Sequence, residues 1–284
     1  MSLFLSGRSK LILAFMLLQQ AVFGQCQADK TSFLAFGDFG MGTPEQYQVA
    51  QSMVDFCKEN RCDFATLLGD NIYPSGVQSA YDLDWKTKFE EPYKELQLDF
   101  YPTLGNHDYF GNIQAQLDYS KENPHWMFPA RYYSFVECLA EFFVIDTENF
   151  DEEQILWLKE NLATSRSHWK ILIGHRPIFS HGGHGDSERL KKDLLPVIKN
   201  KVDFYLSGHD HDLEYMKKNY NPDFVVSGAA GETRPVGKGK STLFSESSVG
   251  FAHLELSSRT ALVRFIGKNG RVLFLHSKLS GKKH

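Results

Sequence analysis

Metal-binding side chains follow glycine at five places in this sequence. The five segments are Gly37-Asp38, Gly69-Asp70, Gly105-Asn106, Gly174-His175 and Gly208-His209-Asp210-His211. Their carboxylate, amide and imidazole groups suit iron, zinc or manganese better than calcium or an iron–sulfur cluster. One such segment alone is typical of a capped strand end or a hydrogen-bonded histidine. Five together favour a site for two metal ions, which would clamp a phosphate ester and activate a water molecule.

An apolar run precedes each of these segments and is expected to form a buried strand. The runs cover residues 32–36, 63–68, 99–104, 169–173 and 202–206. A glycine follows each run, directly in the first four and after Ser207 in the last, and it permits a sharp exit and a close backbone approach. Ligands of open α/β sheets bind outside the carboxyl ends of strands, so we expect the polar side chains to meet there. Helices are predicted from Thr43-Pro44 and over 78–96, 151–162 and 187–200, with mainly strands from residue 224 onward.

Tyr73 lies three residues after Asp70, close enough to reach the same site. Taken alone, this segment also fits a strand followed by an asparagine-containing turn. Many dinuclear phosphoesterases carry a histidine two residues after the first aspartate, but Gly40 occupies that position after Asp38. The first ion is therefore one ligand short unless Tyr73 supplies it. Because a phenolate is a strong, hard donor, this exchange favours Fe(III), with Asp70 bridging the two ions.

The ends and the composition of the chain limit the protein class. Arg8 and Lys10 precede a short apolar stretch and small residues up to Gly24, which predicts a signal peptide over 1–24 and a single domain over 25–284. Export would permit disulfides among Cys26, Cys57, Cys62 and Cys138, whose three possible pairings stay open. The formal net charge of −4 gives no basic surface for nucleic acid, and no internal run approaches membrane-spanning length.

These segments closely resemble the purple acid phosphatases of the calcineurin-like metallophosphoesterase superfamily, particularly the small, tartrate-resistant, single-domain type. Gly69-Asp70-Asn71-Ile72-Tyr73, Gly105-Asn106-His107-Asp108 and Gly111-Asn112-Ile113-Gln114-Ala115-Gln116 contribute most to the resemblance, which runs through essentially the whole mature chain. The resemblance implies an α/β (α+β) fold, a four-layer sandwich of two mixed β-sheets flanked by helices. It also implies a purple colour and activity at acid pH.

The resemblance further implies a role for each candidate ligand. Asp38, Tyr73 and His211 would bind Fe(III), and Asp70 would bridge the two ions. The ligands of the divalent partner, which would be iron, zinc or manganese, are expected to be Asn106, His175 and His209.

Two histidines outside this ligand set are predicted to be catalytic. His107 and a second histidine would stabilise the phosphoryl oxygens and protonate the leaving alcohol. Family spacing favours His184, nine residues after His175, while His181 in the same glycine-rich loop stays the rival.

Two places depart from the family pattern. Arg176 stands where a tyrosine usually follows the ligand histidine, and would either contact phosphate or form a bulkier cationic rim. The stretch from Gly228 to Glu232 also differs from the mammalian sequence, which leaves that wall of the pocket unassigned.

The functional hypothesis is an acid phosphatase, secreted or lysosomal/vacuolar, that hydrolyses phosphate monoesters by attack of a metal-activated hydroxide. Its substrates would be small phosphomonoesters or phosphoproteins, and we expect a monomer without nucleic-acid partners or a membrane span. The alternatives are a phosphodiesterase or nucleotide hydrolase on the same metal site, and a secreted iron-binding protein with incidental activity. Retention of His107 and His184 favours catalysis.

Overall fold

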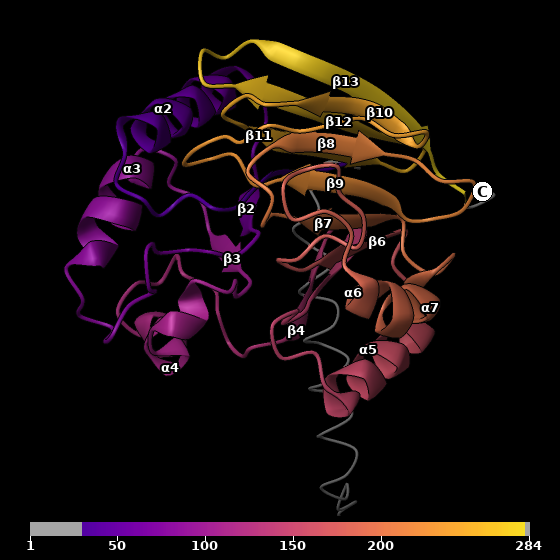
Figure 1. The fold of residues 1–284 in the computed structure, drawn as a ribbon, viewed down its shortest axis with the longest axis horizontal. Helices are drawn as coiled ribbons and strands as arrows, with labels where there is room; N and C mark the ends of the chain where they lie inside the picture. Colours follow the sequence, from indigo (N-terminus) through magenta and orange to yellow (C-terminus); the bar gives the residue numbers. More distant parts are fainter. Residues whose placement is uncertain (1–29, 282–284) are drawn as a thin grey trace, which may run out of the picture.

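Two mixed β-sheets pack face to face in this protein (Figure 1). The computed structural model describes residues 30–281, so the predicted signal peptide and Cys26 lie outside the described part. The six-stranded sheet has the order β13-β12-β11-β1-β2-β3, and the seven-stranded sheet has the order β10-β8-β9-β7-β6-β5-β4. This arrangement, flanked by helices, confirms the fold class that the sequence predicted.

Each sheet contains a parallel block whose strands end in the same direction. In the first sheet β1, β2 and β3 are parallel, and in the second β5, β6, β7 and β9 are parallel. The first sheet consists of β1 (Lys30–Phe36), β2 (Phe64–Leu67), β3 (Phe100–Pro102), β11 (Gly250–Ser257), β12 (Thr260–Gly267) and β13 (Val272–Leu279). The second consists of β4 (Tyr133–Glu137), β5 (Ala140–Val144), β6 (Trp169–Ile173), β7 (Phe204–Ser207), β8 (Leu213–Met216), β9 (Asp223–Ser227) and β10 (Thr242–Glu246).

Helices cover opposite sides of the sandwich (Figure 1). On one side lie α2 (Pro44–Glu59), α3 (Glu91–Tyr93), which continues a π-helical turn over Lys86–Glu90, and α4 (Ile113–Tyr119). On the other side lie α5 (Glu152–Thr164), α6 (Glu188–Asp193) and α7 (Leu195–Ile198). Helix α2 begins as predicted, because the Thr43 hydroxyl accepts the Gln46 N–H at 3.2 Å and Pro44 occupies the first helical position.

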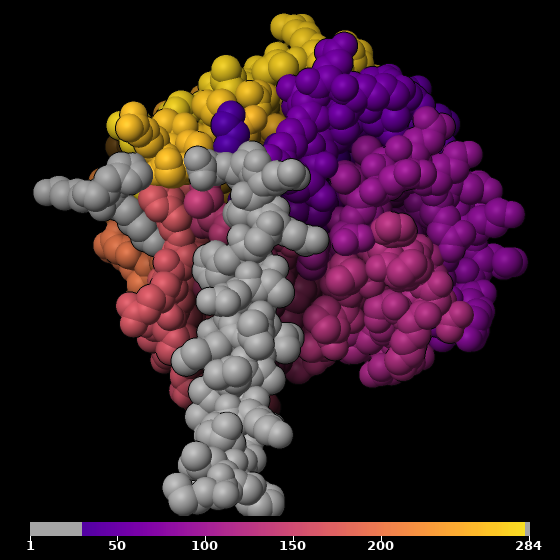
Figure 2. Space-filling model, turned by 180° about the vertical axis from the view of Figure 1, so that it is seen from behind, coloured from indigo at the N-terminus to yellow at the C-terminus, as the bar shows by residue number. Residues whose placement is uncertain are grey.

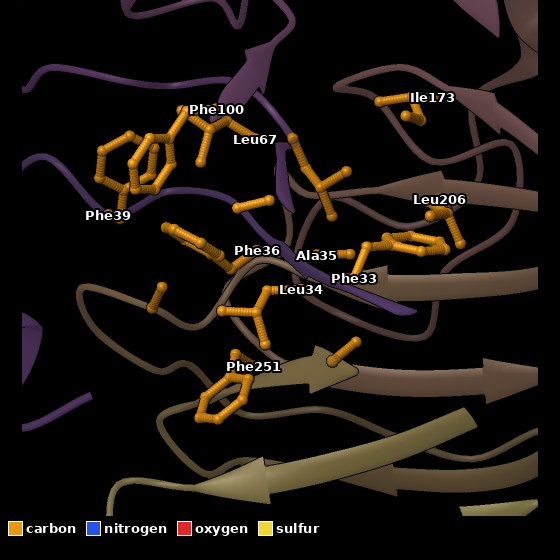
Figure 3. Packing of buried hydrophobic residues seen from close by; sticks show 14 of the residues in the cluster. Phe33, Leu34, Ala35, Phe36, Phe39, Leu67, Phe100, Ile173, Leu206 and Phe251 are labelled. Carbon is orange, nitrogen blue, oxygen red and sulfur yellow. The ribbon is translucent and has the colours of Figure 1, made fainter. Parts of the chain in front are cut away.

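The main core lies between the two sheets, and a second core lies under α5, α6 and α7. Successive residues of a strand point to opposite faces, so Ile171 and Ile173 of β6 enter the main core while Leu172 enters the second. Strand β1 is buried on both faces from Thr31 to Phe36. Figure 3 shows side chains of the main core from both sheets, including Phe33, Phe36, Leu67, Phe100, Ile173, Leu206 and Phe251.

The first described strand lies beside the last part of the chain. Strand β1 pairs antiparallel with β11 on one side and parallel with β2 on the other. From behind, the indigo and violet surface of the early residues adjoins the yellow surface of the C-terminal strands (Figure 2).

Cys57 and Cys62 form a disulfide between the end of α2 and the start of β2, one of the pairs that the sequence left open. Within residues 30–281, no helix is long and apolar enough to cross a membrane.

Candidate metal centre

The carboxyl ends of parallel strands carry most of the predicted metal ligands. Asp38 follows β1, Asp70 follows β2 and Asn106 follows β3, while His175 and His209 follow β6 and β7 of the other sheet. Asp38, Asp70 and His209 have φ values of 57°, 50° and 69°, a left-handed conformation that is uncommon outside glycine. Strained backbone of this kind clusters at functional sites, and here it turns the chain sharply at three of the donors.

Four donor atoms from Asp38, Asp70, Tyr73 and His211 converge, and we call them the first pocket. The Tyr73 Oη lies 2.8 Å from Asp70 Oδ2 and 3.1 Å from both Asp38 Oδ1 and His211 Nε2. Ligands bound at right angles to one ion, with bonds of about 2.1 Å, lie about 3 Å apart. The four atoms therefore have the spacing of ligands to a single cation.

A second pocket is formed by Asn106, His175, His209 and the other oxygen of Asp70. His175 Nε2 lies 3.1 Å from Asn106 Oδ1, 3.2 Å from His209 Nδ1 and 3.5 Å from Asp70 Oδ1. These separations are again those expected between ligands of one ion. The seven predicted ligands thus divide into two groups of donors.

Asp70 belongs to both pockets. Its Oδ2 faces Tyr73 in the first pocket, and its Oδ1 faces His175 in the second. Asp38, Asp70 and His175 are all buried, and one ligand atom from each lies within 4.8 Å of the others. A carboxylate with one oxygen in each of two adjoining pockets is arranged as a bridge between two ions.

Gly40 has a steric reason for replacing the expected histidine. A Cβ atom at this position would collide with the carbonyl oxygen of Asn71, so no side chain fits there without moving the loop that carries Tyr73. The Gly40 carbonyl also accepts the N–H of Tyr73 at 2.8 Å, which holds the tyrosine beside the first pocket. The tyrosine and the glycine therefore depend on each other.

Burial makes the charges of the first pocket unfavourable without a cation. Burial raises the pKa of Asp38, and burial together with the carboxylates of Asp38 and Asp70 raises the pKa of Tyr73 well above its usual range. In contrast, burial and the neighbouring His175 lower the pKa of His209, which keeps this imidazole neutral, the form that binds metals. A bound cation would supply the missing positive charge and favour ionisation of the carboxylates and the phenol.

Two of the three ligand histidines have an acceptor behind them. The Nδ1 of His175 lies 2.9 Å from the Leu68 carbonyl oxygen, to which it donates. The Nδ1 of His211 lies 2.8 Å from Glu232 Oε1, although it forms no hydrogen bond. Such partners usually fix the tautomer and orientation of a metal-bound imidazole. Glu232 was not predicted as a site residue, although it lies in the stretch that departs from the family pattern.

Asp108 is a further residue of the site that was not predicted from the sequence. Its buried carboxylate accepts the backbone N–H of Gly105 at 2.8 Å and of Asn71 at 3.0 Å, and the side-chain N–H of Gln116 at 2.8 Å. Burial, together with the nearby Asp70, raises its pKa to about 7 despite these donors. Asp108 therefore joins the loops that carry Asp70 and Asn106, and its position next to His107 was the only signal in the sequence.

His107 lies at the edge of the first pocket with a defined orientation. Its Nδ1 donates to the Pro74 carbonyl at 2.6 Å, and its ring lies 4.3 Å from the Tyr73 ring between centroids. The other ring nitrogen, Nε2, lies 4.0 Å from Asp70 Oδ2. Nε2 therefore remains available for a ligand beside the metal-binding atoms.

The structure separates the two histidines of the 180–184 loop. His184 stacks on His209 with ring centroids 4.2 Å apart, and its backbone N–H donates to Asp210 at 2.8 Å. The Nδ1 of His181 instead pairs with the buried Glu214 at 2.7 Å, and the His181 carbonyl accepts the N–H of Gly237. Of the two rivals, only His184 contacts the metal centre, and its catalytic role stays a prediction.

Comparison with known proteins gives the family. Residues 31–213 match the calcineurin-like phosphoesterase family. The chain is 30% identical to human tartrate-resistant acid phosphatase type 5, covering 93% of this chain and 95% of the human one. It is 33% identical to purple acid phosphatase 17 of Arabidopsis thaliana, covering 72% and 71% of the two chains.

A solved structure also resembles this protein. GAP50, described as the anchor in the inner membrane complex of Plasmodium, superposes with a TM-score of 0.82 at 28% identity, covering 89% of this chain and 90% of GAP50. The sequence matches and the similar fold point to the same family as the two metal pockets. The chain belongs to the calcineurin-like metallophosphoesterases and, within them, to the purple acid phosphatases.

Proposed function

We propose that this protein is an acid phosphatase that hydrolyses phosphate monoesters with Fe(III) in the first pocket and a divalent ion in the second. The observation that carries this proposal is Asp70, whose two oxygens face two complete sets of donors. The first set contains two carboxylates and a phenol, which together suit a trivalent ion. The second contains one shared carboxylate, an amide and two imidazoles, which suit divalent iron, zinc or manganese.

The donor atoms fit such a pair of ions in number, type and spacing. When bound, two ions would clamp the phosphoryl oxygens and activate a water for attack on phosphorus. Asp38, Tyr73 and His211 would hold the first ion, Asn106 and the pair His175–His209 would hold the second, and Asp70 would bridge them.

His107 and His184 would bind and protonate the substrate from opposite parts of the site. Because His107 Nδ1 donates to Pro74, its Nε2 is the atom that faces substrate. From that position it can hydrogen-bond the ester oxygen and donate a proton as the alcohol leaves. His184, which stacks on His209, can donate to a phosphoryl oxygen on the second-pocket side.

Export to the cell exterior or to an acidic organelle completes the proposal. The Cys57–Cys62 disulfide supports it, because disulfides persist mainly in oxidising compartments. Small phosphomonoesters and phosphoproteins are the proposed substrates of a monomeric enzyme. The net charge of −4 means that an anionic substrate must be drawn by the metal centre and not by the whole surface.

A second candidate function is that of a non-catalytic anchor. The observation that favours it is the resemblance to GAP50, which is described as an anchor in a membrane complex. The complete donor set, with His107 and His184 beside it, favours catalysis instead.

Substitution of the two histidines tests the proposed function. We expect His107→Ala to lower kcat for a phosphate monoester by about a hundredfold or more, because general acid catalysis contributes about that much. His184→Ala should lower turnover in the same direction. His125→Ala is a matched control, since His125 is an exposed histidine paired with Asp99. Unchanged monoester turnover in both test variants, with their metal content retained, would refute the catalytic proposal.

A further inference from the structure

The outer nitrogen of His209 differs from those of the other two ligand histidines. His175 and His211 each have an oxygen atom behind the ring, from Leu68 and Glu232. Behind His209 lies the Arg176 guanidinium, whose Nη1 is 2.9 Å from His209 Nε2. Arginine has only donors, so this nitrogen of His209 must accept.

The acceptor role of Nε2 determines where the proton of a neutral His209 lies. A neutral imidazole carries one N–H, so the proton is on Nδ1 when Nε2 accepts from Arg176. His209 Nδ1 is 3.2 Å from His175 Nε2, and His175 Nδ1 donates to the Leu68 carbonyl. The three contacts form one consistent chain of donors and acceptors: Arg176 to His209, His209 to His175 and His175 to Leu68.

A metal ion in the second pocket requires the opposite tautomer. The ion needs the lone pair of Nδ1, so the proton must be on Nε2. That N–H would then point at an N–H of Arg176, placing two donors against each other. One hydrogen bond is lost, and the guanidinium must move away from His209 before the second ion is held without this conflict.

Arg176 is not free to move away easily. Its Nε and Nη2 donate to the two carboxylate oxygens of Glu148 at 2.7 and 2.9 Å, the bidentate geometry of a strong ion pair. Its backbone N–H donates to the Thr147 hydroxyl at 3.0 Å, and its carbonyl accepts from the Tyr205 hydroxyl at 2.6 Å. Because Glu148 balances its charge, the donor conflict matters more than simple charge repulsion.

We propose that Arg176, held by Glu148, selectively weakens binding of the second metal ion by occupying the outer nitrogen of His209. This inference rests on the dinuclear centre proposed above and deepens it. The first pocket would fill readily, whereas occupancy of the second would depend on the local supply of the divalent ion. Arg176 would thus determine when the centre is complete.

Zinc affinity of the second pocket tests this inference. Protein with the first pocket filled by Fe(III) is equilibrated with chelator-buffered Zn²⁺, and bound zinc is measured by elemental analysis. We expect Arg176→Gln to bind zinc about tenfold more tightly or better, because its amide oxygen can accept the N–H of metal-bound His209. Arg176→Met, which removes the donor without supplying an acceptor, should show a smaller gain.

Arg189→Met is the matched control for charge. Arg189 donates to the carbonyl oxygens of Glu148 and Phe150 but contacts no ligand of either pocket, so its loss should leave zinc affinity unchanged. Equal or weaker zinc binding in both Arg176 variants would overturn the inference and leave the proposed function standing. Absence of zinc binding in every protein, including the unsubstituted one, would overturn the dinuclear centre as well.

The tautomer of His209 provides a test that needs no substitution at Arg176. In metal-free protein with ¹⁵N-labelled histidine, NMR should show the His209 proton on Nδ1. A proton on Nε2 would overturn the inference. His175 is an internal reference, because its Nδ1 also carries the proton toward Leu68.

Discussion

The first pocket takes its donors from Asp38, Asp70 and the Tyr73 phenol, with one imidazole, whereas the second takes an amide, two imidazoles and the other oxygen of Asp70. Their surroundings differ in the same sense, because a carboxylate lies behind the first pocket's His211 and a guanidinium lies behind the second pocket's His209. One fold thus presents two adjoining sites, of which the first is richer in anionic donors.

This difference shows how paired sites can hold unlike ions. A cluster of anionic donors stabilises a higher charge, while neutral donors favour a divalent ion that exchanges more easily. The groups behind the ligands extend the contrast, since an acceptor strengthens an imidazole ligand and a donor weakens it. On the proposed dinuclear centre, one ion would be held tightly and binding of the other would be conditional.

Removing the shared ligand should have the largest effect. We expect Asp70→Ala to lose both ions and to lower phosphatase activity about a thousandfold, because the carboxylate has one oxygen in each pocket. Metal content and monoester turnover of the purified variant check this. Asp118→Ala is the control, since Asp118 lies on the exposed side of α4 paired with Lys121. Retention of both ions by Asp70→Ala would contradict the bridging role.

Substitutions of the residues behind the ligand histidines should have smaller effects on metal binding, opposite in sign in the two pockets. Glu232→Gln should weaken iron retention in the first pocket by about tenfold, because the carboxylate no longer increases the basicity of His211. Retention of iron is measured by chelator challenge. Glu255→Gln is the control, because Glu255 of β11 pairs with Lys30 of β1 and with no ligand of either pocket. Arg176→Gln should instead strengthen metal binding in the second pocket. Changes of the same sign in both variants would contradict the contrast between the pockets.

Much of the site followed from the sequence because strand ends are local features. A run of apolar residues ending in glycine and a polar side chain predicts where that side chain lies in a parallel sheet, which was enough for Asp38, Asp70 and Asn106. Glycine at position 40, where many dinuclear phosphoesterases carry histidine, also pointed to Tyr73 as the missing ligand. A Cβ atom at position 40 would collide with Asn71, which is the physical reason for the glycine.

Other features depended on contacts between distant parts of the chain. Strand β8 was not predicted, because its Glu214 is an acidic residue that is nevertheless buried. Its carboxylate is satisfied by Ser180 and His181, more than thirty residues earlier in the chain. The same contact distinguishes His181 from His184, which no local pattern could do. Strand β10 and the short helix α4 were also missed, and the helix predicted over 78–96 is restricted to residues 86–93. The roles of Arg176 and Glu232 likewise arise from which side of an imidazole each one faces.

The most direct test of the central claim is a visible absorption spectrum of the purified protein together with metal analysis. We predict a purple protein whose iron is bound by the Tyr73 phenolate, and loss of the visible band in Tyr73→Phe with the fold retained. A colourless protein that holds two zinc ions, or a Tyr73→Phe variant that keeps the colour, would contradict it.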